Sequence, residues 1–85
     1  MKIIYTKHAI NKFTDLKKLG IIVKKKDIRK IIENPDNIDM DTDPPKIIAT
    51  GNFGKEHILR VVYRNDGDII ITITFYPARK GRYFS

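Results

Sequence analysis

The side chain best suited to proton transfer near neutral pH is His8, which precedes Lys12 by four positions in the segment KHAINKFTDLKK. On a helix this spacing places both side chains on one side. Histidine can act there as a general acid or base, although a lone helical histidine can equally be structural and donate to a backbone carbonyl. By helical angle the pair flanks the apolar stripe, so we expect it at the rim of the core.

A second polar group alternates along the last two predicted strands. Because successive strand residues point to opposite faces, one face should carry cations for phosphate, hydroxyl donors and a ring that stacks on a base. An ordinary solvated sheet face also favours threonine and arginine, so both interpretations stay open. The residues in this group are Arg60, Arg64, Thr72, Thr74 and Tyr76.

The C-terminal segment, residues 77–85, is basic and aromatic and follows the last predicted strand. Polar chain ends are usually frayed. The density of cationic and aromatic side chains here instead favours a segment with a function. The residues concerned are Arg79, Lys80, Arg82 and Tyr83.

The composition excludes several kinds of site. The chain has no cysteine, which excludes disulfides, thiolate metal ligands and thiol catalysis. His8 and His57 are far apart in sequence, so we predict no zinc site. Asp36, Asp39, Asp41 and Asp43 do not have the spacing of a calcium loop, and no nucleotide-binding or hydrolase motif occurs. We therefore predict neither a metal nor a cofactor.

The apolar pattern predicts two helices followed by strands. Thr6 is the expected N-cap of a helix over residues 7–18, with Gly20 as its stop signal. A second helix begins at residue 26 or 27 and ends at Asn34-Pro35, since the residue before proline avoids helical geometry. The predicted strands are residues 3–5, 37–41, 46–53, 57–64 and 68–76, with a hairpin turn at Asp66-Gly67.

This order predicts a single α+β domain over residues 1–85, with two N-terminal helices packed on one face of an antiparallel sheet of about four strands. Strict alternation would place Leu59, Val61 and Tyr63 under the helices. It would place Ile69, Ile71, Ile73 and Phe75 there as well.

The net charge of +7 is unevenly distributed. Residues 1–33 carry ten Lys or Arg against three Asp or Glu, residues 34–57 carry two against five, and residues 58–85 carry five against two. Such asymmetry favours a polyanionic partner, although it also suits a solubilising surface. No secretory signal or membrane-spanning stretch is visible, so we expect a soluble, cytoplasmic protein.

Three segments in this order carry a family resemblance: TKHAINKF, DIRKIIENPD and ILRVVYRNDGDIIITITFYPARKGRY. Together they resemble the uncharacterised DUF4258 family, which is similar in fold to the RelE and BrnT toxins, small metal-independent ribonucleases of toxin–antitoxin systems. The resemblance implies a RelE-like fold and active-site positions at His8, Arg60, Thr74 and the basic tail with Tyr83. Leu19-Gly20 departs from the pattern, because related sequences often carry Arg-Gly there.

The expected function is therefore a metal-independent endoribonuclease in which the ribose 2′-hydroxyl attacks the adjacent phosphate. An acid or base, phosphate-binding cations and a stacking or proton-donating tyrosine are needed. A non-catalytic RNA- or DNA-binding module is one alternative, and a protein-interaction partner of an acidic antitoxin-like protein is another. The expected catalytic residues are His8, Arg60, Arg82 and Tyr83, and the expected nucleic-acid-binding residues are Lys12, Arg64, Thr74, Tyr76, Arg79 and Lys80.

Overall fold

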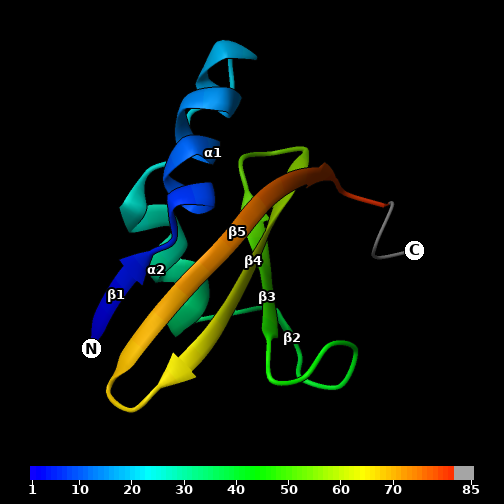
Figure 1. The fold of residues 1–85 in the computed structure, drawn as a ribbon. Helices are drawn as coiled ribbons and strands as arrows, with labels where there is room; N and C mark the ends of the chain where they lie inside the picture. The colour runs from blue at the N-terminus through cyan, green and yellow to red at the C-terminus, as the bar shows by residue number, and fades with distance from the viewer. Residues whose placement is uncertain (82–85) are drawn as a thin grey trace.

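The computed structural model describes residues 1–81 and contains two helices and five strands (Figure 1). The helices lie together on one side of the sheet, and the two longest strands, β4 and β5, form its centre (Figure 1). In chain order the elements are β1 (Lys2–Tyr5), α1 (Lys7–Lys18), α2 (Lys25–Glu33), β2 (Asn37–Asp39), β3 (Ile47–Phe53), β4 (His57–Asp66) and β5 (Ile69–Arg79).

The sheet is mixed, with the strand order β1-β5-β4-β3-β2. β1 pairs parallel with β5, and every other pair is antiparallel. The predicted α+β class and the two helices are confirmed, whereas the purely antiparallel sheet of about four strands is wrong. The sequence of a short strand such as β1 contains no signal for its partner, and parallel pairing requires a long crossover rather than a recognisable turn.

Both helices begin at side-chain caps. Thr6 caps α1 as predicted, because its Oγ1 accepts from the backbone N–H of Ala9 at 3.1 Å. The same hydroxyl donates to the carbonyl of Ile73 at 2.9 Å and so ties the start of α1 to β5. At the start of α2, the Asp27 carboxylate accepts from the backbone N–H of Lys24 at 2.8 Å. α2 therefore begins at Lys25, slightly earlier than predicted.

The core lies between the helices and one face of the sheet. Helix residues such as Ala9, Leu16 and Ile28 pack against Leu59, Val61 and Phe75 of the central strands, as predicted. α2 lies especially close to β3, because a Cβ placed on Gly51 would approach Cγ1 of Ile31 to 3.0 Å. No helix within residues 1–81 covers the opposite face of the sheet (Figure 1). We call this second surface the open face.

A β-bulge in β5 changes which of its residues face the helices. Val62 pairs with Thr74 and Tyr63 pairs with Thr72, so Ile73 is the extra residue. Thr72 is consequently buried under the helices at 0% exposed, although strict alternation had placed it on the open face. Ile69 and Ile71 face away from the helices, so their predicted core positions are wrong. Phe75, which follows the bulge, is buried as predicted.

The burial of Thr72 yields a stability prediction. Its hydroxyl has no hydrogen-bond partner within residues 1–81, and an unpaired buried polar group costs about 1–3 kcal/mol. We expect Thr72→Val to raise the free energy of unfolding by about 1 kcal/mol. In thermal denaturation the Tm should then rise by about 4–8 °C.

Thr6→Val is the matched control, since it removes a hydroxyl that both donates and accepts a hydrogen bond. It should lower the free energy of unfolding by about 1–2 kcal/mol. A Thr72→Val protein that melts below the parent protein would contradict the prediction.

Candidate nucleic-acid interface

Arg60 and Tyr76 form a side-chain pair on the open face. They are direct partners across β4 and β5. Their neighbours Leu59, Val61 and Phe75 face the helices, so alternation directs the pair to the other side of the sheet. Arg60 Nε donates to the Tyr76 hydroxyl at 3.0 Å, and the guanidinium carbon lies 5.8 Å from the centre of the ring. This arrangement holds a fixed cation beside a half-buried phenol.

Residues of three strands share this face with the pair. Thr50 of β3 lies directly opposite Arg60, and its hydroxyl is buried without a partner within residues 1–81. Thr74 and Arg64 share the open face by register, since they pair with Val62 and Ile71 respectively. The structure therefore places four of the predicted residues of β4 and β5 on the open face, namely Arg60, Arg64, Thr74 and Tyr76.

An acidic group, Asp39 of β2, accompanies these cations. Hydrogen bonds from the side chain and backbone of Thr42, and from the backbone of Asp41, hold the pKa of Asp39 below its ordinary value. The positive charge of Arg60 adds a smaller lowering of this pKa. At neutral pH Asp39 is therefore an anion within the field of Arg60, and it makes this part of the face less attractive to phosphate.

His8 and Lys12 belong to the helix layer. α1 buries Ala9 and Leu16 against the covered face of the sheet, and His8 is exposed while Lys12 is half-buried. Arg60 is directed to the opposite face of the same sheet. The sheet thus lies between the two groups, and the structure does not bring His8 into one arrangement with Arg60.

The tail residues divide between positions inside and outside the described structure. Arg79 is exposed at the end of β5, where it pairs with His57, and alternation places both on the helix side of the sheet. The backbone N–H of Lys80 donates to the carbonyl of Glu56 at 2.9 Å. Arg82 and Tyr83, both predicted as catalytic, lie outside the described residues.

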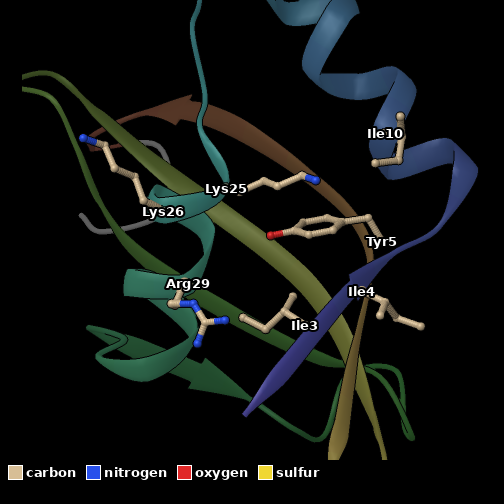
Figure 2. A pocket seen from close by; sticks show the side chains of 7 residues that line it. All are labelled: Ile3, Ile4, Tyr5, Ile10, Lys25, Lys26 and Arg29. Carbon is tan, nitrogen blue, oxygen red and sulfur yellow. The ribbon is translucent and has the colours of Figure 1, made fainter.

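The sequence reasoning missed a basic groove between β1 and the helices. The groove measures about 580 Å³ and is lined by Ile3, Ile4, Tyr5, Ile10, Lys25, Lys26 and Arg29 (Figure 2). Lys25 Nζ lies 5.1 Å from the centre of the Tyr5 ring. Burial raises the pKa of Tyr5, and the charge of Arg29 partly opposes this. The run Lys24-Lys25-Lys26 with Arg29 one turn later was the available signal, but such a run usually marks a solvated face.

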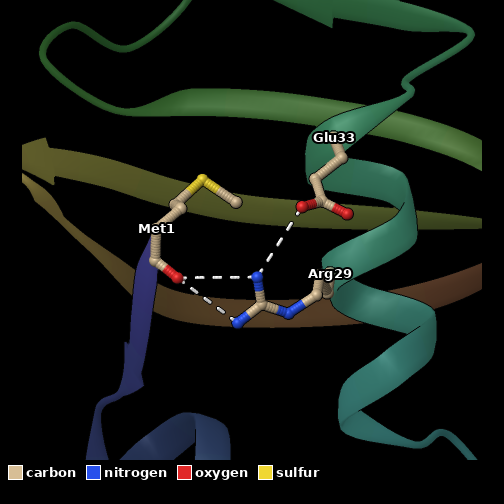
Figure 3. Close-up of polar contacts among 3 residues, drawn as sticks. All are labelled: Met1, Arg29 and Glu33. Carbon is tan, nitrogen blue, oxygen red and sulfur yellow. Dashed lines mark hydrogen bonds and ion pairs between the residues drawn. The ribbon is translucent and has the colours of Figure 1, made fainter.

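Arg29 connects this groove to the start of β1. Its guanidinium donates to the backbone carbonyl of Met1 at 3.4 and 3.5 Å, and it lies 3.6 Å from the Glu33 carboxylate (Figure 3). The Arg29–Glu33 pair is half-exposed, so its contribution to stability is small. Its clearer effect is to hold the guanidinium in position along the outer edge of β1.

Comparison with models of protein families, with curated proteins and with solved structures gives no significant match. Within residues 1–81, histidine and carboxylate side chains form no group of three that could hold a metal ion. Neither of the helices described here is long and apolar enough to cross a membrane.

The hydrogen bonds of Asp39 yield a pH prediction. Because its folded pKa lies below the ordinary 3.8, the stability that it gives to the 39–42 turn is complete above that pH and is lost as the pH falls through the folded pKa. Thr42→Val removes the largest cause, so an NMR titration should find the Asp39 midpoint raised. Thr42→Ser keeps the hydroxyl and should leave the midpoint low. Equal midpoints in the two variants would contradict this explanation.

Proposed function

We propose that the open face binds RNA, with a phosphate at Arg60 and a base against Tyr76. The observation that carries this proposal is the Arg60–Tyr76 pair, in which Arg60 Nε donates to the phenol at 3.0 Å. A guanidinium held by a neighbour keeps a defined orientation toward an oxyanion, and a tyrosine ring beside it offers a surface for stacking. The net charge of +7 supports a polyanionic partner.

Cleavage at the same place is the second candidate, and the position of the Tyr76 hydroxyl favours it. The Tyr76 oxygen accepts from Arg60, and that bond does not use the phenol proton. In the proposed reaction the ribose O2′ gives its proton to a solvent water molecule and bonds to phosphorus, while the bond from phosphorus to O5′ breaks. Tyr76 gives its proton to the leaving O5′, so the products are a 2′,3′-cyclic phosphate and a 5′-hydroxyl.

The resemblance of the sequence to the DUF4258 family supports the catalytic form of the proposal. On that proposal the chain is a RelE-like, metal-independent ribonuclease of the cytoplasm, and an acidic antitoxin-like protein is its protein partner. His8 has no role in the arrangement proposed here, because it lies in the helix layer. The proposed site therefore consists of Arg60 and Tyr76, with Thr74 next to them and Arg64 further along the same face of β4.

Three variants separate binding from cleavage. Arg60→Gln should weaken binding of a fluorescent single-stranded RNA about tenfold at low salt, measured by anisotropy. Tyr76→Phe keeps the ring, so it should preserve most of the affinity and reduce cleavage by about 10²–10⁴-fold on a denaturing gel in the presence of EDTA. His8→Ala should change neither quantity.

Lys17→Gln, on the exposed side of α1, is the charge-matched control for Arg60→Gln. Equal losses of affinity in these two variants would mean that RNA follows net charge alone, and the open face would not be the binding site. Intact RNA after long incubation with the parent protein would eliminate the catalytic candidate while leaving the binding proposal standing.

A further inference from the structure

The outer edge of β1 is available for pairing with another strand. β1 stands at the end of the sheet order, so only one of its edges faces β5. The N–H of Thr6 donates to Thr72, and because backbone groups alternate along a strand, Lys2 and Ile4 also point their N–H and C=O groups toward β5. Ile3 and Tyr5 then point theirs outward. The carbonyl of Met1 follows the same alternation, since it reaches Arg29 rather than β5.

The basic groove runs along this edge. Ile3 and Tyr5 pair with Ile70 and Thr72, which lie under the helices, so their side chains face the helix side. Lys25 extends over the Tyr5 ring on that same side, and Lys26 extends the other way from the start of α2 (Figure 2). Among residues 1–81, the lining contains the cations Lys25, Lys26 and Arg29 and no carboxylate. Ile4 pairs with Ile71 instead, and it offers a 38% exposed apolar side chain on the open side.

We propose that this edge binds an extended acidic peptide as an added strand of the sheet. The outward backbone groups of Ile3 and Tyr5 pair with the peptide main chain, which is the usual mode of strand addition. Alternate peptide side chains then point to opposite sides. Acidic ones lie on the helix side near Lys25 and Arg29, and apolar ones lie beside Ile4. The peptide therefore alternates acidic and apolar residues.

Charge complementarity selects this occupant over two others. A second copy of the same edge would bring two sets of these cations together, and charged residues beside an edge commonly prevent such self-pairing. A nucleic acid would satisfy the cations through its phosphates, but it has no main chain that matches the outward N–H and C=O groups of a strand. The inference does not rest on the RNA proposal, because it concerns a different edge and different residues.

The test uses an acetylated, amidated peptide of four Glu-Val repeats as the probe. Amide hydrogen exchange followed by NMR should slow at least about tenfold for Ile3 and Tyr5 when the peptide is added, and little for Ile4, which already lies in the ladder. Lys25→Gln combined with Lys26→Gln should weaken peptide binding about tenfold. The matched double variant Lys17→Gln and Lys18→Gln, and Arg60→Gln as well, should leave it unchanged.

Three results would overturn the proposal. One is that two N-methylated peptides, one methylated at the odd and one at the even residues, both bind as well as the unmethylated peptide. Each keeps its side chains but loses alternate main-chain N–H donors, so strand addition requires at least one of them to bind more weakly. A second is protection by the Glu-Val peptide that does not include Ile3 and Tyr5. A third is that the Lys25→Gln and Lys26→Gln changes weaken binding of a uridine octanucleotide but not binding of the peptide. The groove would then be a nucleic-acid surface.

Discussion

The bulge at Ile73 is the constraint on which the rest of the structure depends. Ile73, the extra residue in β5, has a carbonyl that accepts from the Thr6 hydroxyl, while the Thr6 N–H donates to Thr72 as the last bond of the regular β1–β5 ladder. One residue therefore ends β1, caps α1 and fixes both to the central strand. The irregularity thus holds the N-terminal strand and helix in register with the sheet.

The same bulge determines what each face of the sheet presents. Beyond it Phe75 enters the core and Tyr76 reaches Arg60 on the open face, while before it Thr72 is buried and Ile71 is directed outward. The two candidate surfaces lie on either side of this point. The Arg60–Tyr76 pair follows the bulge along β5, and the edge groove lies beside the part of β5 that precedes it.

Local signals predicted most of the elements. The Thr6 cap and the helix end at Asn34-Pro35 each depend on neighbouring residues, so a single sequence predicts them. The hairpin turn was predicted one residue too early, because Asp66 still pairs with Ile69 and the turn residues are Gly67 and Asp68. The bulge depends on long-range pairing between β4 and β5, and the parallel partner of β1 is far away in sequence. For that reason Thr74 and Tyr76 were placed on the correct face while Thr72 was not. The groove could not be predicted because its lining comes from three elements that only the fold brings together.

The close approach between Gly51 and Ile31 has a consequence for how this chain can change over time. With Cγ1 of Ile31 only 3.0 Å from where a Cβ would stand, a side chain at position 51 requires Ile31 to move by a few tenths of an ångström. A larger residue at 51 is better accommodated beside a smaller one at 31. The size of the side chain at 31 therefore limits what position 51 can accept.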